Sequence, residues 1–243
     1  KSNMLIGGVQ ELTTLDFPGR LAAVVFTLGC NFRCGYCHNP QFVECQGETL
    51  TSAIPEEVFF KFLEKRKSRL EGVCISGGEP TLQPDILEFA RKIKQAGFLV
   101  KLDTNGAKPL VLEKMIAEKA VDYFAMDIKT SPSRYGEIVA VKPPRGGLTA
   151  TIMDEIKKSK EIIQNSGLPY EFRTTAVKGK HTREVFEEIG EWLKGAEAYF
   201  IQNFRNKKTL DEEYKKEEGF SEDELAKFKL LMKKYVKNCG IRM

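Results

Sequence analysis

The sequence lacks an apolar run long enough to cross a bilayer. None of its hydrophobic stretches approaches the roughly 18 residues that a spanning helix needs, and no charged-then-apolar leader opens the chain. The 243 residues carry a net charge of only +4, and acidic and basic side chains alternate along predicted helix faces such as residues 64–67. We therefore expect a cytoplasmic protein with a solvated surface, and neither a membrane nor a nucleic-acid partner.

Histidine is scarce, and the cysteines are not paired as in zinc sites. The chain has two histidines and six cysteines, and Cys30, Cys34 and Cys37 form one group of three. Zinc favours separated pairs of ligands, and a reducing compartment makes clustered cysteines metal ligands more often than disulfides. Of the others, Cys74 is predicted to be a small buried residue. Cys45 is a loop residue or a spare ligand, and we favour the loop residue.

The sequence does contain a regular alternation of short apolar runs and amphipathic segments. The predicted strands are residues 21–28, 72–76, 98–102, 122–126, 170–175 and 198–202. The predicted helices cover 55–69 and 152–166 and four further segments that begin near residues 86, 109, 182 and 221. Alternation implies parallel strands with right-handed crossovers. Because six units are too few for a closed barrel of eight, we expect an α/β fold, an open partial (β/α)6 TIM-like barrel.

One domain is expected to span residues 1–243. Residues 1–20 are predicted to form an antiparallel ribbon or turn, 21–204 the (β/α)6 core, and 205–243 a C-terminal helical segment. No internal repeat or low-complexity tract interrupts this order.

Polar and glycine-rich residues recur where the predicted strands end. The cysteine loop follows the first strand, and the later segments are 77–80, 103–106, 127–129, Arg173 and 202–203. In barrel-like α/β folds functional residues gather at this edge. Ordinary turn chemistry explains any one of the glycine-rich segments, but it does not explain three thiols.

Three thiolates suit an iron–sulfur cluster with one iron left open. A cubane cluster normally takes four cysteines, so a set of three leaves one iron free to chelate a substrate. A zinc-stabilised binding module without turnover is the alternative, and it would need a fourth ligand.

At these residues the chain resembles the radical S-adenosylmethionine (SAM) enzymes. Cys30, Cys34, Tyr36 and Cys37 match the C-x3-C-x-aromatic-C signature, and the second motif is matched by Gly77-Gly-Glu-Pro80. The resemblance implies a [4Fe-4S] cluster whose open iron binds SAM. It also implies reductive cleavage of SAM to methionine and a 5′-deoxyadenosyl radical.

The resemblance extends over essentially the whole chain to the small activating enzymes of glycyl-radical proteins. Residues 17–19, 37–40, 103–106 and 127–129 fit this group; residues 172–175, 202–204 and 209–211 look most like an anaerobic ribonucleoside-triphosphate reductase activating protein. That implies hydrogen abstraction from a glycine of the partner reductase, a flavodoxin- or ferredoxin-type electron donor, and an anaerobic setting. The alternatives are a radical SAM enzyme acting on a small molecule or peptide, or one that activates another glycyl-radical enzyme such as pyruvate formate-lyase.

Site roles are carried over from this resemblance residue by residue. It implies that Cys30, Cys34 and Cys37 hold the cluster, that Tyr36 lies near the adenine, and that the backbone of Gly77, Gly78 and Glu79 meets the SAM amino group. It further implies a monovalent cation beside Asp103, Thr104 and Asp127, and basic groups, Lys129 and Arg173, near the SAM carboxylate.

Two points stay open at this level. A related activating enzyme has a SAM-contacting histidine after its sixth strand, where this chain has Gln202-Asn-Phe-Arg205. The connection from Ser131 to Gly147 is either a partner-docking loop, with Tyr135 and Arg145 as candidate contacts, or an idle surface loop.

Overall fold

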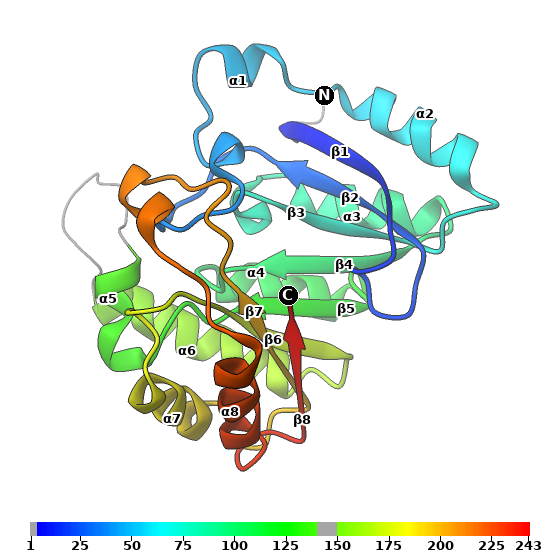
Figure 1. The fold of residues 1–243 in the computed structure, drawn as a ribbon. Helices are drawn as coiled ribbons and strands as arrows, with labels where there is room; N and C mark the ends of the chain where they lie inside the picture. Colours follow the sequence, from blue (N-terminus) through cyan, green and yellow to red (C-terminus); the bar gives the residue numbers. More distant parts are fainter. Residues whose placement is uncertain (1–3, 140–149) are drawn as a thin grey trace.

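The computed structural model describes residues 4–139 and 150–243, and all strands in these ranges belong to one sheet (Figure 1). Strand order follows the chain from β1 to β8; β1 pairs antiparallel with β2, and every later pair is parallel. The strands are β1 Ile6–Thr13, β2 Ala22–Thr27, β3 Gly72–Gly77, β4 Leu99–Thr104, β5 Tyr123–Asp127, β6 Tyr170–Ala176, β7 Ala198–Asn203 and β8 Asn238–Arg242. The predicted partial barrel is confirmed, and β1 pairs with β2 as an antiparallel ribbon.

Helices follow the parallel strands and cover the outer face of the sheet (Figure 1). They are α1 Glu48–Thr51, α2 Glu56–Arg66, α3 Ile86–Gln95, α4 Pro109–Ala117, α5 Tyr135–Ile138, α6 Ala150–Gln164, α7 Arg183–Trp192 and α8 Glu222–Met232. Short 3-10 turns lie at Pro40–Phe42, Pro80–Leu82, Pro132–Arg134 and Glu212–Lys216. None of the described helices is long and apolar enough to cross a membrane.

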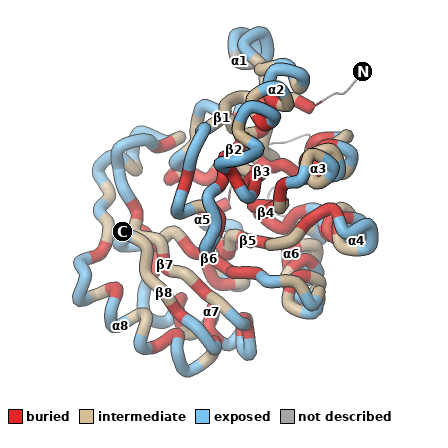
Figure 2. Tube along the Cα trace, turned by 90° about the vertical axis from the view of Figure 1, so that its right-hand side faces the viewer, coloured by how far each residue is buried: buried red, intermediate tan, exposed pale blue. Residues whose placement is uncertain are grey.

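The apolar faces of these helices form the core against the outer side of the sheet. On α3, Ile86, Phe89, Ala90 and Ile93 are all at most 2% exposed. Burial of one such large side chain contributes roughly 1.5–3 kcal/mol. Figure 2 shows the result: β3, β4 and β5 are mostly buried, and α3 and α4 expose the side away from the sheet.

Two helix starts follow their sequence signals. The Thr182 side chain accepts a hydrogen bond from the Val185 backbone N–H at the start of α7. Ser221 and Glu224 form the predicted capping box at the start of α8. Each cap satisfies backbone N–H groups that lack a partner within the helix.

The predicted C-terminal helical segment is only partly helical, because it ends in the strand β8. The run Asn238-Cys-Gly-Ile-Arg242 has little β propensity of its own. It extends along the free edge of β7, and Gly240 lies so close to the Phe200 ring that a Cβ would sit 2.5 Å from a ring carbon. Pairing with β7 and close packing against the Phe200 ring therefore stabilise residues 238–242 as a strand.

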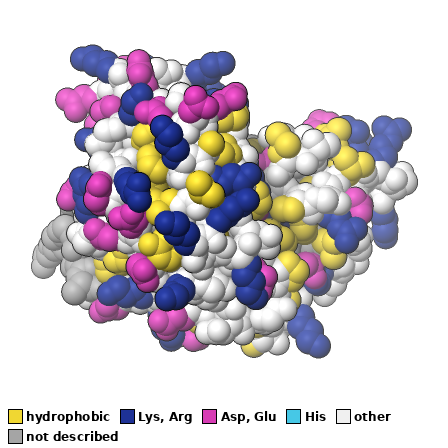
Figure 3. Space-filling view, turned by 60° about the horizontal axis from the view of Figure 1, so that its bottom comes forward, with side chains coloured by type: hydrophobic (Ala, Val, Ile, Leu, Met, Phe, Trp, Pro, Cys, Tyr) yellow, Lys and Arg dark blue, Asp and Glu magenta, His cyan; other side chains and the backbone are white. Residues whose placement is uncertain are grey.

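Charges of both signs share the surface. On the face drawn in Figure 3, Lys and Arg side chains are intermingled with Asp and Glu, as the alternating sequence pattern predicts.

Candidate active site

A cavity of about 400 Å³ lies at the C-terminal ends of the parallel strands. Its wall includes every site residue that the sequence predicted: Cys30, Cys34, Tyr36, Cys37, Gly77, Gly78, Glu79, Asp103, Thr104, Asp127, Lys129 and Arg173. Gln202 also lines it, at the end of β7. Parallel pairing in register brings these distant segments to one edge of the sheet.

The cysteine loop begins directly after β2 and is held by backbone hydrogen bonds. The N–H of Gly29 donates to the carbonyl of Phe42 at 2.8 Å, and that of Cys30 to Val43 at 3.0 Å. Cys37 N–H donates to the Cys34 carbonyl at 3.0 Å, which turns the chain so that the thiols share one wall. All three cysteines are free, and Cys34 is the most buried at 7% exposure.

Burial keeps these thiols protonated in the free chain. It raises the pKa of Cys30 to about 12 and that of Cys34 to about 11, and it also raises the pKa of Cys37. A metal ligand must be the thiolate, so binding of iron would release these protons.

The donor set fits an iron–sulfur cluster better than a single metal ion. Among the described residues, no three His, Cys, Asp or Glu side chains converge closely enough to hold one ion. In a cluster each thiolate binds a different iron, so wider spacing is required. The buried Tyr36 hydroxyl lines the cavity and has no hydrogen-bond partner in the described part of the chain. It is therefore a polar group that a ligand in the cavity would satisfy.

Residues 204–217 cover the cysteine loop from outside. The Asp211 N–H donates to the Gly35 carbonyl at 3.0 Å, and the Tyr214 ring lies where a Gly35 side chain would be, 2.4 Å from its Cβ position. Phe204 stacks on His38, with 5.7 Å between the ring centroids. Only glycine at position 35 therefore allows this cover to close on the loop.

Gly77 and Gly78 pack on the protein's own backbone. Gly77 has φ +121°, and a Cβ there would lie 2.2 Å from the Thr27 nitrogen. A Cβ on Gly78 would lie 2.1 Å from the Gly29 carbonyl oxygen. These glycines fix the loop after β3 against the cysteine loop; their approach to a SAM amino group stays a prediction.

The Glu79 carboxylate joins the loops after β3 and β4. It is 1% exposed and accepts hydrogen bonds from the Thr81 N–H at 3.1 Å, the Thr81 hydroxyl at 2.5 Å, the Thr104 hydroxyl at 2.8 Å and the Asn105 N–H at 2.7 Å. Burial raises its pKa, while these donors act against the rise. The side chain is fully engaged, so only the backbone of Glu79 is available to a ligand.

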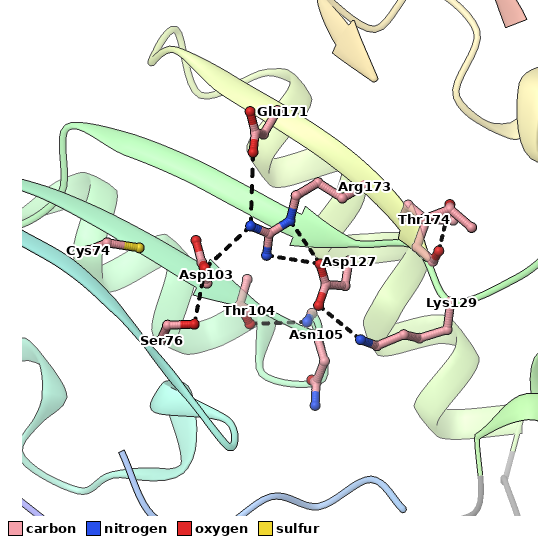
Figure 4. A network of polar contacts seen from close by, with 12 residues as sticks. Cys74, Ser76, Asp103, Thr104, Asn105, Asp127, Lys129, Glu171, Arg173 and Thr174 are labelled. Carbon is pink, nitrogen blue, oxygen red and sulfur yellow. Dashed lines mark hydrogen bonds and ion pairs between the residues drawn. The ribbon is translucent and has the colours of Figure 1, made fainter. Parts of the chain in front are cut away.

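Arg173 lines the cavity and is at the centre of an ion network (Figure 4). Its Nε and Nη2 each lie 2.9 Å from Asp127 Oδ1, and its Nη1 lies 3.3 Å from Asp103 Oδ2. Lys129 Nζ donates to the other Asp127 oxygen at 2.9 Å, and Lys101 Nζ pairs with Asp103. Removing one partner from such a buried set costs roughly 3–5 kcal/mol.

These ion pairs keep both aspartates charged. Burial opposes ionisation, but Arg173 and Lys101 hold the pKa of Asp103 below its usual range, and Arg173 and Lys129 do the same for Asp127. Three side-chain cations already balance the two carboxylates. A monovalent cation bound beside Asp103 and Asp127 would have to displace one of these three side chains. The cation site stays a prediction.

The Radical SAM superfamily matches residues 24–194 of this sequence. The chain belongs to the radical SAM superfamily. Membership implies a [4Fe-4S] cluster and SAM, the two groups for which the thiols, the unpartnered tyrosine and the cationic wall are suited.

Within the superfamily the chain belongs to the glycyl-radical enzyme activating enzymes. It is 37% identical over 240 residues to the Methanocaldococcus jannaschii protein MJ1227, provisionally named as such an enzyme, and the match covers 98% of this chain and 95% of that one. It is 31% identical over 199 residues to the pyruvate formate-lyase-activating enzyme of Streptococcus mutans, over 78% and 72% of the two chains.

Solved structures share the fold of this radical SAM protein. Streptococcus suis SuiB bound to S-adenosylmethionine superposes with a TM-score of 0.66 at 16% identity. The match covers 89% of this chain and 48% of SuiB, so the chain spans about half the length of that structure.

Sequence reasoning missed several residues of the radical SAM site. Lys101 is completely buried on the inward face of β4, and the alternation Lys101-Leu-Asp103 was the available signal. The Asn105 amide donates to Asn31 Oδ1 at 2.9 Å and so ties the loop after β4 to the cysteine loop. His181, remote in sequence, is 1% exposed and contacts the Lys129 carbonyl at 2.9 Å.

The hypothesis of a docking loop from Ser131 to Gly147 is only partly testable, because residues 140–149, including Arg145, lie outside the described residues. Tyr135 is fully buried; its hydroxyl accepts from the Lys129 N–H at 3.1 Å. Tyr135 therefore packs inside the protein against the backbone of Lys129 and is not available to a partner. Asn203, the last residue of β7, makes two side-chain hydrogen bonds with the backbone of Phe220.

His181 should make stability depend on pH. Its Nδ1 accepts from the Val177 N–H, so its Nε2 carries the proton donated to Lys129, and burial lowers its pKa from 6.5. Below about pH 6.5 the unfolded chain binds a proton that the folded chain does not, so the free energy of unfolding falls as pH falls, by at most ~1.4 kcal/mol per pH unit.

Urea unfolding at pH 7.5 and pH 5.5 measures this effect. In His181→Gln, whose amide offers a donor and an acceptor, the loss of stability between the two pH values should be smaller than in the wild type. Burial also lowers the pKa of His38. Because His38 is present in both proteins, its contribution to the pH dependence cancels in the comparison. Equal losses would show that His181 does not titrate differently in the folded chain.

Proposed function

We propose that this protein is an activase that uses SAM cleavage to generate a glycyl radical on a partner enzyme. The observation that carries the proposal is the set of three thiols, Cys30, Cys34 and Cys37, on the same cavity as the cationic side chains Lys129 and Arg173. Three thiolates leave one iron of a cubane without a protein ligand. The cations suit the carboxylate of a ligand bound there.

When bound, a reduced cluster and SAM would supply a 5′-deoxyadenosyl radical, a species able to take a hydrogen atom from a glycine Cα of the partner. Lys129 Nζ uses one of its three N–H groups on Asp127, and within residues 4–139 and 150–243 the others are free for a carboxylate. The buried Tyr36 hydroxyl, which has no partner among the described residues, offers a hydrogen bond within the cavity. Residues 204–217 cover one side of the cysteine loop, which would limit the access of water to a reactive carbon radical.

The partner we favour is an anaerobic ribonucleoside-triphosphate reductase, in the cytoplasm and with a flavodoxin- or ferredoxin-type electron donor. Residues 172–175, 202–204 and 209–211 support this choice by resemblance. The similarity to pyruvate formate-lyase-activating enzymes supports the alternative partner, pyruvate formate-lyase. Glycine is a suitable target because its Cα radical is stabilised by amide groups on both sides and no side chain blocks access.

The test is anaerobic reconstitution with iron and sulfide, reduction with dithionite, and addition of SAM with each candidate partner. We expect 5′-deoxyadenosine and a glycyl radical, detected by electron paramagnetic resonance, on one partner. 5′-Deoxyadenosine without a radical on either partner would favour a small-molecule or peptide substrate. A colourless protein with one zinc and no product would refute the proposal.

A further inference from the structure

Glu171 is a fully buried carboxylate that lies below the cavity and outside the predicted site. It is 0% exposed and projects from β6 two residues before Arg173, on the same face of the strand (Figure 4). A buried carboxylate is costly unless a cation and hydrogen bonds compensate it. Its partners therefore decide the electrostatics of the cavity floor.

Arg242 of β8 is the main partner of Glu171. Its Nη1 donates to Oε1 at 2.8 Å and its Nη2 to Oε2 at 2.7 Å, so the pair is bidentate. The guanidinium also lies 4.0 Å from the centre of the Phe200 ring. Strand pairing of Arg242 with Gln202 fixes the backbone beneath it. The two hydrogen bonds to Glu171, the contact with the Phe200 ring and the pairing of β8 with β7 thus hold the Arg242 side chain in one orientation.

Arg173 lies between Glu171 and the cavity. Its Nη1 is 3.3 Å from Asp103 and 3.9 Å from Glu171 Oε1. The same nitrogen therefore faces two carboxylates, and it stays closer to Asp103 while Arg242 occupies both oxygens of Glu171. Without Arg242, Glu171 would be a buried charge whose nearest cation is Arg173.

We propose that Arg242 is a positioning residue, which neutralises Glu171 and thereby commits Arg173 to Asp103 and Asp127 on the cavity wall. β8, the strand that the sequence did not predict, then supplies the residue that completes the site. The part of this inference that concerns SAM rests on the proposed function, whereas the position of Arg173 does not.

The first test is nuclear magnetic resonance of the arginine Nε–H groups in the protein without added SAM, with the Arg173 signal assigned through Arg173→Lys. We expect Arg242→Met to shift the Arg173 signal and the double variant Glu171→Gln/Arg242→Met to restore it. Arg242→Lys, a milder second variant, retains charge but cannot make both bonds, and should shift the signal less in the same direction. An unchanged Arg173 signal in both Arg242 variants would overturn the inference.

The second test is the dissociation constant for SAM of the reconstituted protein. Arg242→Met should weaken binding roughly 10- to 100-fold, by analogy with the loss of a group that orients a metal ligand. The double variant should return to within about threefold of wild type.

An arginine that merely anchors β8 predicts the opposite for the double variant, which would bind as weakly as Arg242→Met because the anchor is still missing. That outcome would also overturn the inference. Failure of the wild type to bind SAM would count against the proposed function, and the Arg173 signal would still decide the role of Arg242.

Discussion

Replacement of Cys34 by alanine is expected to abolish cluster binding and 5′-deoxyadenosine formation together. Cys34 is the most buried of the three thiols, and its carbonyl accepts the Cys37 N–H that turns the loop. With two thiolates left, a cubane cluster has too few protein ligands to be retained. Iron and sulfide content, visible absorbance and product analysis after reduction measure the loss, and product should be below detection.

Two other cysteines provide matched controls for this variant. Cys239 on β8 is buried, and it does not line the cavity. Cys45 lies beside the cysteine loop; a Cβ on Gly29 would be 3.7 Å from its Cβ. Cys239→Ala and Cys45→Ala should both retain iron and activity. A cluster that survives Cys34→Ala and is lost in Cys45→Ala would show that the ligand set is wrong.

Replacement of Glu79 by alanine is expected to cost roughly 2–6 kcal/mol of stability, about 1–3 kcal/mol for each of two buried N–H groups that lose their acceptor. The change leaves the backbone N–H groups of Thr81 and Asn105 without an acceptor, and both are buried. It also disconnects the loops after β3 and β4, so SAM binding should weaken. Urea unfolding should show a lower midpoint with an unchanged m value.

Glu79→Gln tests whether charge or shape matters. One end of the amide would turn an N–H group toward an N–H donor, so we expect a loss of roughly 1–3 kcal/mol, smaller than for alanine. Glu71→Gln is the control, because that carboxylate pairs with Arg20 at the surface and should matter little. A Glu79→Ala protein as stable as the Glu71 control would mean that the four hydrogen bonds do not hold the loops.

The parallel core was predictable because its signals are local. Apolar runs such as Val73-Cys-Ile75 and amphipathic stripes such as that of α3 have the periods of strands and helices. The wall of the cavity followed from the same pattern, since polar residues after parallel strands must meet at one edge. Motif resemblance then singled out twelve of the residues that line it.

What the sequence did not reveal depends on distant partners. β8 exists because β7 has a free edge. Lys101 is buried because Asp103, two residues further along β4, pairs with its amine and Cys74 lies beside it on the neighbouring strand β3. Glu171 and Arg242 are 71 positions apart, and neither belongs to a motif. Pairs so far apart in the chain leave no periodic pattern and no motif in the sequence, so only the folded structure reveals them.

The cover over the cysteine loop has a consequence for how the protein is made. His38 is stacked by Phe204 and accepts from the Arg205 N–H, 167 positions later in the chain. At about 5–20 residues per second, a ribosome needs roughly ten to thirty seconds to synthesise that stretch. Throughout this interval the nascent thiols lack the cover that residues 204–217 provide in the folded protein, so they are more accessible during synthesis than after the C-terminal third has folded.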